Sequence, residues 1–391
     1  MTGSAPKRML FVIGSMGGGG AERCTVDLIA RMDRARFAPE LYLAYRTGEL
    51  LKDVPADVPI HAHVDGAIEQ SLSQKLAGKF RLLSEARMWD IHRLLGREKY
   101  DLIFAWGLRH AYETAWPAKR HGVARVSYCV QDPVEEYYVD FPHPTPWRYR
   151  VAHWSYASND RIYANAIDLC RRTERFYHLP EKSVELFLNL RDFQRLERLA
   201  EAPAPPRTLS GHRLVCVGRF ERQKGHAVML EALADLIHRQ RRDVHLVLVG
   251  QGSLEQELRA QAVRLGIADR IEWAGFQQNP VPYFKSADVF VLPSLWEGLP
   301  NVLIEALLLG IPSVATDCPT GPREVTEEGR FGTLVPPGDV GALAQAIAQA
   351  LDHLPEEQAR AQEASSAMRK KYDVDLGVRD LEDRFLEVIE T

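Results

Sequence analysis

With 391 residues, the chain is too long for one ordinary hydrophobic core and suits two domains. Its 46% hydrophobic and 26% charged residues are typical of a soluble globular protein, and no run approaches the ~20 apolar residues that a membrane-spanning helix needs. Residues 1–195 hold 28 basic against 24 acidic side chains, a net charge of +4, and the remainder carries −8, an imbalance too small for a nucleic-acid-binding protein.

The five cysteines favour neither a disulfide framework nor a zinc site, because they are odd in number and widely spaced. This usage fits a reducing cytosol. The start of the chain is polar, and the apolar residues 9–13 are too few for the core of a signal peptide. We therefore expect a cytoplasmic protein.

A glycine-rich loop follows the first predicted strand, residues 9–13, and precedes an amphipathic helix that runs to about Met32. Strand, glycine-rich loop and helix form the phosphate-binding opening of a Rossmann-type unit, because adjacent glycines let the backbone approach a ligand closely. The glycines are not spaced as G-x-G-x-x-G, so a dinucleotide site is the weaker interpretation. A turn without any ligand is the structural alternative.

Residues 73–95 predict a long helix in which basic and apolar side chains interleave, after short strands at 41–44 and 60–64. This pattern has two interpretations. One is an ordinary packed helix with a solvated face, which the residues alone favour. The other is a helix on a membrane surface, which the weakly basic first half of the chain favours.

Polar residues follow two further predicted strands of the first half, at 100–106 and 123–130. His110 lies on the helix after the first of these strands, and Gln131 and Asp132 come directly after the second. Ligands bind at the carboxyl ends of parallel strands, so these three residues are candidates for contact with a sugar or an acceptor. The alternative is that they are surface polar residues without a ligand.

A linker rich in alanine and proline, residues 200–210, separates this half from a second series of strands. The first of these strands, residues 213–218, is followed at once by Arg219 and then by Lys224. Further strands are predicted at 244–249 and 270–276.

The most informative stretch begins after the apolar, β-branched residues 289–292, which predict a buried parallel strand. Gly298 and Pro300 mark a turn, and an apolar helix follows. The backbone N–H groups between Gly298 and Asn301 should therefore lie at a helix N-terminus, where anions bind.

Glu297 and Glu305 bracket that turn. Two carboxylates beside an anion site suit a ligand that carries hydroxyls next to its phosphates. A nucleotide sugar is such a ligand, because its hydroxyls donate to the carboxylates while its diphosphate accepts from the N–H groups.

The two glutamates and their spacing resemble the E-x7-E signature of the GT4-like family of retaining glycosyltransferases. The continuation at residues 316–324 is similar to a subgroup that builds bacterial surface polysaccharides and lipid-linked glycans. The resemblance is strongest over about residues 213–335.

The resemblance implies an α/β fold of GT-B architecture, with two Rossmann-like domains and an interdomain cleft. The first domain, residues 1–200, would be the acceptor side, and the second, residues 201–370, would bind the donor. Residues 371–391 would form a C-terminal helix that packs back toward the first domain.

The implied reaction is transfer of a hexose or N-acetylhexosamine from a nucleoside diphosphate, expected to be UDP, with retention at the anomeric carbon. Glu297 would hold the donor sugar and Glu305 the ribose. Arg219 and Lys224 would stabilise the charge on the leaving diphosphate without a metal. The other donor-site candidates are loop residues: Gly17, Gly18, Gly19, Gly250, Phe276, Gln277, Gly298, Leu299, Pro300 and Asn301.

Two further features of the sequence bear on the comparison with the GT4-like family. Gln131 stands where many relatives carry a histidine close to the reacting sugar. The one Asp-x-Asp pattern, at Asp373 and Asp375, lies in a helical region and is interpreted as a helix boundary, so we expect neither a metal nor a cofactor.

The expected partners are a nucleotide sugar, a glycan or lipid-linked acceptor and the inner face of the cell membrane, with no nucleic acid. Three other functions stay open: a nucleotide-sugar epimerase of the same fold, an inactive nucleotide-sugar-binding regulator, and an NAD-dependent oxidoreductase, which would lack the usual glycine spacing.

Overall fold

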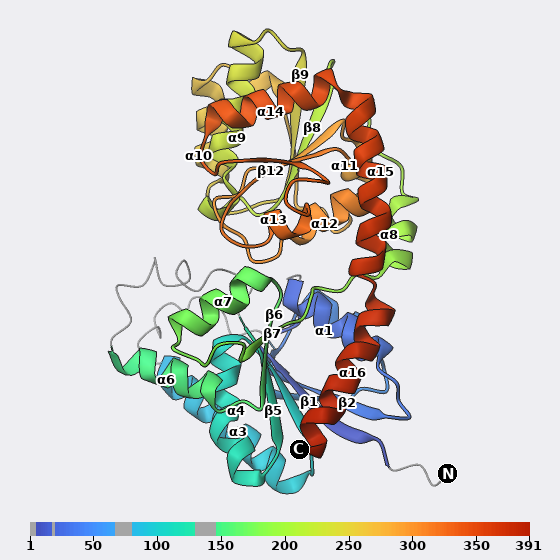
Figure 1. Cartoon of the computed structure of the whole chain (residues 1–391). Helices are drawn as coiled ribbons and strands as arrows, with labels where there is room; N and C mark the ends of the chain where they lie inside the picture. Colours follow the sequence, from blue (N-terminus) through green and yellow to red (C-terminus); the bar gives the residue numbers. More distant parts are fainter. Residues whose placement is uncertain (1–4, 18–19, 67–79, 130–145) are drawn as a thin grey trace. The chain divides into compact units, whose positions relative to one another are not determined.

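The protein folds into two compact units, seen in a computed structural model that describes residues 5–17, 20–66, 80–129 and 146–391 (Figure 1). Unit 1 comprises residues 1–191 and 374–391, and unit 2 comprises residues 192–373. Each unit contains a parallel β-sheet with helices on both faces. The prediction of an α/β protein with two Rossmann-like domains is confirmed.

The sheet of unit 1 has, within the described residues, seven parallel strands in the order β3-β2-β1-β4-β5-β6-β7. The strands are β1 (Lys7–Ile13), β2 (Phe37–Arg46), β3 (Ile60–Asp65), β4 (Leu102–Trp106), β5 (Ala124–Tyr128), β6 (Arg161–Ala164) and β7 (Val184–Leu186). The helices are α1 (Gly20–Arg31), α3 (Phe80–Arg97), α4 (Gly107–His121), α6 (Pro146–Ala157), α7 (Ile167–Phe176) and α16 (Val374–Glu390).

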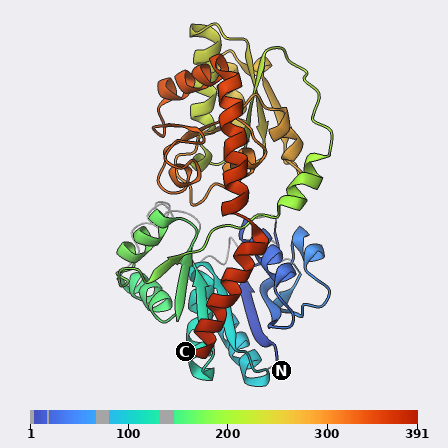
Figure 2. The ribbon, with the colours of Figure 1, turned by 45° about the vertical axis from the view of Figure 1, so that its right-hand side comes forward.

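The alternating side chains of the strands divide the core of unit 1 into two layers. On β1, Phe11 faces a cluster with α1 and α16, whereas Leu10 faces α3 and α4. Helix α16 lies across one face of this sheet with α1 beside it (Figure 2). The ring of Phe385 on α16 packs edge-on against Phe104 of β4.

The sheet of unit 2 has six parallel strands among its residues, all of which are described, in the order β10-β9-β8-β11-β12-β13. These strands are β8 (His212–Val217), β9 (Val244–Val249), β10 (Ile271–Gly275), β11 (Val289–Leu292), β12 (Ser313–Thr316) and β13 (Thr333–Val335). The helices are α8 (Phe193–Ala200), α9 (His226–Ala234), α10 (Glu255–Arg264), α11 (Val281–Ser286), α12 (Asn301–Leu308), α13 (Pro322–Val325), α14 (Val340–Asp352) and α15 (Leu354–Lys371).

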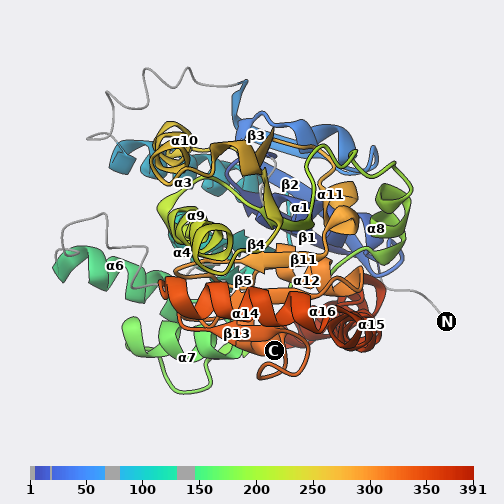
Figure 3. The same ribbon diagram turned by 90° about the horizontal axis from the view of Figure 1, so that it is seen from above.

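Helices cover both faces of the sheet in unit 2 because its strands are apolar on both sides. Leu214 of β8 faces a cluster shared with α9, α10 and α14, and Val215 faces the opposite side, where Tyr283 of α11 packs nearby. Figure 3 shows α9 and α10 next to each other, in agreement with their contacts.

In both sheets the strand order reverses beside the first strand: between β1 and β4 in unit 1, and between β8 and β11 in unit 2. At such a point the connections leave toward opposite faces, so the loops at the carboxyl ends of the two strands diverge and leave room for a ligand.

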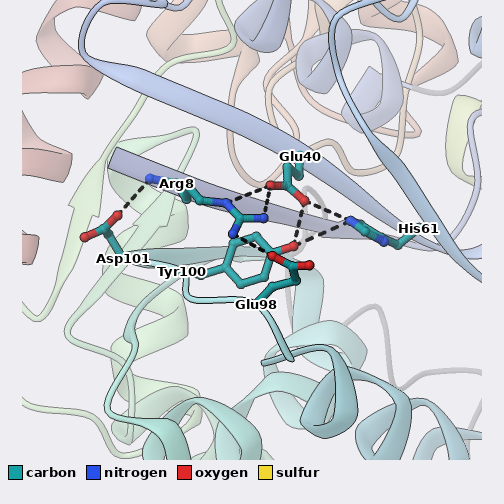
Figure 4. Close-up of polar contacts among 6 residues, drawn as sticks. All are labelled: Arg8, Glu40, His61, Glu98, Tyr100 and Asp101. Atoms are coloured by element: carbon teal, nitrogen blue, oxygen red, sulfur yellow. Dashed lines mark hydrogen bonds and ion pairs between the residues drawn. The ribbon is translucent and has the colours of Figure 1, made fainter. Parts of the chain in front are cut away.

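A polar network lies toward the amino ends of the strands in unit 1 (Figure 4). The carboxylate of Glu40 on β2 accepts from the hydroxyl of Tyr100 at 2.6 Å and from Arg8 Nε at 3.0 Å, and it pairs with His61 at 2.8 Å. Arg8 also reaches Glu98, and its backbone N–H donates to Asp101. This network joins β1, β2, β3 and the segment before β4, and it leaves the carboxyl ends of the strands to the candidate sites.

The proline- and aromatic-rich residues 140–149 predict an irregular loop, and this is wrong for residues 146–149, which are the start of α6. Proline fits the first turn of a helix, because the backbone N–H that it lacks would have no partner there. The basic helix is found as α3 from Phe80, whereas its predicted first residues, 73–79, lie outside the described part of the chain.

Candidate functional site

The loops after β8 and β11 meet where the strand order of unit 2 reverses. The loop after β8 carries Arg219 and Lys224, and the loop after β11 carries Glu297. The backbone N–H of Leu295 donates to the carbonyl oxygen of Gln223 at 2.7 Å and ties the two loops together. We call these two loops, with the start of α12, the carboxyl edge of unit 2.

Two glycines permit the close approach of backbone at this edge. Gly225 has φ +64°, and a Cβ there would overlap the carbonyl oxygen of Pro293 in the loop after β11. Gly321 has φ +85°, and a Cβ there would overlap the carbonyl oxygen of Gly298. The loops after β8, β11 and β12 are therefore packed backbone to backbone, which fixes their side chains relative to one another.

Lys224 and Glu297 form an ion pair at the centre of the carboxyl edge. Lys224 Nζ donates to Glu297 Oε1 at 2.7 Å and to Oε2 at 2.9 Å. The hydroxyl of Ser294 donates to Oε1 at 2.6 Å. Glu297 is only 4% exposed, whereas the Lys224 side chain keeps 16% of its surface in solvent. The carboxylate is thus fixed by two donors, and the lysine remains reachable from outside.

The surroundings of this ion pair contain two neutral groups. Burial raises the pKa of Cys318 to about 12, with a further contribution from the charge of Glu297, so its thiol stays protonated. Burial and then the positive charge of Lys224 lower the pKa of His226 to about 4, so its imidazole is uncharged near neutral pH. The positive charge of this edge therefore comes from its lysine and arginine side chains, among them Lys224, Arg219 and Arg222, which lies over the ring of Trp296.

The remaining donor-site candidates of unit 2 lie on this edge or on the neighbouring strand ends. Gly298, Leu299 and Pro300 lead into α12, which begins at Asn301, and the half-buried Glu305 is in its second turn. The N–H groups of a helix's first turn have no intrahelical acceptor and favour an anion. Arg219 is exposed on the loop after β8.

Gly250 and Phe276 follow β9 and β10, next in order across the sheet from β8. Phe276 is 56% exposed, an unusual state for a large aromatic ring that follows a core strand. Gln277 donates from Nε2 to the carbonyl oxygen of Ala274 at 2.6 Å, which leaves its own amide oxygen to other partners. The structure thus brings the eleven candidates of unit 2 to the carboxyl ends of the strands of one sheet.

The candidates of unit 1 are only partly described. His110 lies in the first turn of α4, after β4, and Gly17 follows β1. Gly18, Gly19, Gln131 and Asp132 lie outside the described residues. Within this unit, His110 and the loop after β1 flank the point of strand-order reversal between β1 and β4.

Sequence reasoning missed the side chains that hold Glu297 in place. Ser294 donates to its carboxylate, and the hydroxyl of Thr320 donates to its backbone carbonyl oxygen. A serine three residues before a candidate glutamate was a usable signal, because that short separation lets the hydroxyl reach back to the carboxylate. Thr320 comes from the loop after β12, and only the fold brings it near.

Chemically, this edge can hold an anion and hydroxyl groups together. An exposed arginine, a reachable lysine and a helix N-terminus attract phosphate, and two carboxylates accept from hydroxyls. Among the described residues, no group of three or more His, Cys, Asp or Glu side chains is placed to hold a metal ion. Over the same residues, no helix has the length and apolar character to cross a membrane.

Comparison with known proteins finds a family model that is similar to this region. Residues 211–353 match the family model described as glycosyl transferases group 1. The chain is 29% identical over 197 residues to the N-acetylgalactosamine-N,N'-diacetylbacillosaminyl-diphospho-undecaprenol 4-alpha-N-acetylgalactosaminyltransferase of Campylobacter jejuni, covering 50% of this chain and 52% of that protein. It is 34% identical over 158 residues to the lipopolysaccharide core biosynthesis glycosyltransferase LpsE of Rhizobium meliloti, covering 40% and 42%. The chain thus spans about half or less of the length of these curated relatives.

The whole chain resembles solved structures in fold. A crystal structure of HepE from Anabaena in complex with UDP gives a TM-score of 0.76 at 21% identity, and the match covers 97% of this chain and 100% of that one.

Proposed function

We propose that the chain is a retaining glycosyltransferase, from the match of residues 211–353 to the glycosyl transferases group 1 model and from the GT-B fold. Its donor is a UDP-sugar that carries a hexose or an N-acetylhexosamine. Its acceptor is a glycan or a lipid-linked glycan of a surface polysaccharide. The observation that carries the proposal is the ion pair of Lys224 and Glu297 at the strand-order reversal of unit 2.

A nucleotide-sugar donor is supported by the division of charge at the carboxyl edge of unit 2. Arg219, Lys224 and the N-terminus of α12 attract the diphosphate, and Glu305 accepts from ribose hydroxyls. Glu297 accepts from hydroxyls of the sugar. HepE, which shares the fold, was crystallised with UDP, and this supports uracil as the base.

The proposed chemistry rests on fixed positive charge. Breaking the bond between the sugar and the phosphate develops negative charge on the leaving UDP, and cations already in place stabilise it without reorganisation. Lys224 meets this requirement because Glu297 and the packed loops hold its ammonium group at the edge. We assign no covalent nucleophile, and retention rests on the resemblance of Glu297 and Glu305 to the E-x7-E signature.

The acceptor class is supported by the names of the relatives, which specify a diphospho-undecaprenol-linked glycan and the lipopolysaccharide core. A lipid-linked acceptor lies at the inner face of the cell membrane, so we propose peripheral contact there. Trp89, 51% exposed on α3, and the neighbouring Arg93 support this contact. Sedimentation with anionic vesicles tests it, and Trp89→Ala should reduce the bound fraction.

A panel of nucleotide sugars tests the donor. We expect one UDP-sugar to raise the melting temperature, because a ligand that binds only the folded form stabilises it. With that donor and a lipid-linked glycan, UDP should be released and the product should keep the anomeric configuration of the donor by NMR. Conversion of the sugar without an acceptor would indicate an epimerase. Binding without turnover, under every acceptor tried, would indicate a regulator and would contradict the proposal.

A further inference from the structure

A buried ion pair lies beneath His110 in unit 1. Arg87 of α3 is 1% exposed, and Glu113 of α4 is wholly buried. Arg87 donates to Glu113 Oε1 from Nε at 2.8 Å and also from Nη2. Arg87 is one of the basic residues in the pattern of the helix predicted at 73–95, but its partner on α4 draws it into the core and away from any solvated or membrane-facing surface. A buried pair of this kind is often no more stable than apolar residues of the same volume, so its presence calls for another explanation.

The second oxygen of Glu113 is used by His110. Glu113 Oε2 lies 2.9 Å from His110 Nδ1. Although burial alone raises the pKa of Glu113, the hydrogen bonds with His110 and Arg87 outweigh it and hold this pKa below its usual value. The carboxylate is therefore ionised near neutral pH and can only accept. It follows that His110 donates through Nδ1, and that its neutral form carries no proton on Nε2.

His110 Nε2 lies against the loop that follows β1. A Cβ placed on Gly14 would be 3.6 Å from it, an ordinary van der Waals distance, so Gly14 lies directly beside this nitrogen. The loop is held by hydrogen bonds from Tyr45 N to Gly14 O at 2.9 Å and from Met16 N to Thr47 O at 2.8 Å. No described residue makes a hydrogen bond to Nε2, and the His110 side chain is 10% exposed.

We propose that Glu113, held by Arg87, is a positioning residue for His110, and that His110 Nε2 accepts a hydrogen bond from a hydroxyl of the substrate at the strand-order reversal of unit 1. This inference rests on the proposed function, because that function supplies a substrate rich in hydroxyls. The pair fixes both the ring orientation and the tautomer. The hydrogen bonds of His110 and Arg87 together keep the carboxylate ionised, and the ionised carboxylate keeps the proton on Nδ1.

A structural role is the competing explanation, in which Arg87 and Glu113 simply join α3 to α4. The kcat of a folded variant without the pair separates the two, because a helix clamp alone would leave kcat unchanged. The tautomer of His110 tests the step that the proposal needs first, namely that Nδ1 donates to Glu113. Nitrogen NMR of protein labelled with 15N-histidine reports this directly, and His110→Ala assigns the signal. We expect the full-length wild type to show a protonated Nδ1 and a bare Nε2. Protonation of Nε2 in the neutral ring would overturn the proposal.

The matched variants are chosen so that no buried charge is left alone. The double variant Arg87→Met with Glu113→Gln removes both charges at similar volume, whereas Glu113→Gln alone leaves a buried arginine and is expected to fold poorly. Ser84→Ala is the control, because it removes only the 3.2 Å bond from Arg87 Nη2 and keeps the Arg87–Glu113 pair.

With the best donor and acceptor, we expect the folded double variant to lose kcat by about 10- to 100-fold, with the KM for the UDP-sugar unchanged. The nitrogen spectrum should show a mixture of His110 tautomers. Ser84→Ala should match the wild type in both readouts. An unchanged kcat in the folded double variant would overturn the proposal. Failure of the proposed function would give a different result. The wild-type protein would then release no UDP, although His110 would still carry its proton on Nδ1.

Discussion

Replacing Lys224 by methionine should destabilise unit 2, because the change leaves Glu297 ionised and buried with Ser294 as its remaining side-chain donor. Removing one partner of a buried ion pair costs about 3–5 kcal/mol. Lys224 is 16% exposed, so water can replace part of its contact, and we expect about 2–3 kcal/mol. For a unit of this size, that corresponds to a melting temperature lower by about 5–10 °C.

Replacing Glu297, the other partner of the ion pair, should lower the stability of unit 2 by less. Glu297→Gln keeps the hydrogen bond from Ser294 and lets the flexible Lys224 turn toward solvent, so we expect about 1 kcal/mol. In the double variant no charge is unpaired, and it should be more stable than Lys224→Met alone by about 1–2 kcal/mol.

Thermal unfolding of the full chain by calorimetry measures all three variants, with Lys370→Met as the control because Lys370 is an exposed lysine on α15. Lys224→Met that melts within about 1 °C of Lys370→Met would refute this reasoning, and so would a double variant less stable than Lys224→Met.

Three further changes test other parts of the structure. Glu40→Gln should lose about 1.5–3 kcal/mol of stability at pH 7, because the hydroxyl of Tyr100 and its other donors lose a buried carboxylate. Burial raises the pKa of Glu40, but the hydrogen bonds from Tyr100, His61 and Arg8 lower it by more. The pKa of Glu40 therefore lies below the ordinary value of 4.5. The stabilisation by the Glu40 carboxylate is therefore complete above pH 4.5 and is lost as the pH falls below it. The urea midpoints of the Glu40→Gln variant and the wild type should converge in acid. A difference between the two midpoints that stays constant with pH would contradict this. Gly225→Ala should lower the free energy of unfolding by about 1–3 kcal/mol and abolish sugar transfer, because the new Cβ overlaps the carbonyl oxygen of Pro293. Normal activity of this variant in a UDP-release assay would contradict the prediction. Glu305→Ala should weaken binding of the UDP-sugar by at least about 10-fold in calorimetric titration while the melting temperature changes little, and equal affinity would remove Glu305 from the site.

The strand–turn–helix around Gly298 was predictable because its signals are local. Four apolar residues form β11, glycine and proline mark the turn, and the apolar residues after Asn301 form α12. The position of Arg219 directly after a core strand was predictable for the same reason. The assignment of two Rossmann-like units came from the resemblance to the GT4-like family, and the series of strands and helices on either side of the linker agreed with it.

Contacts between distant residues were not predictable from local patterns. Lys224 and Glu297 are 73 residues apart, and each was assigned separately to a ligand although they also bind each other. Arg87 fits the polar face of a helix by periodicity, yet Glu113, 26 residues later, pairs with it inside the core. A helical pattern shows which residues share a face, but it does not show which neighbouring helix covers that face.

The most direct test of the central claim is calorimetric titration of UDP into the full-length wild type, Arg219→Gln and Arg264→Gln. Arg219 is exposed at the carboxyl edge of unit 2, and Arg264 is an exposed arginine at the end of α10, before β10 begins. We predict that the wild type and Arg264→Gln bind UDP equally and that Arg219→Gln binds at least about 10-fold more weakly, because it lacks one charge-assisted bond to phosphate. Equal binding by all three proteins, or no binding by the wild type, would contradict the account.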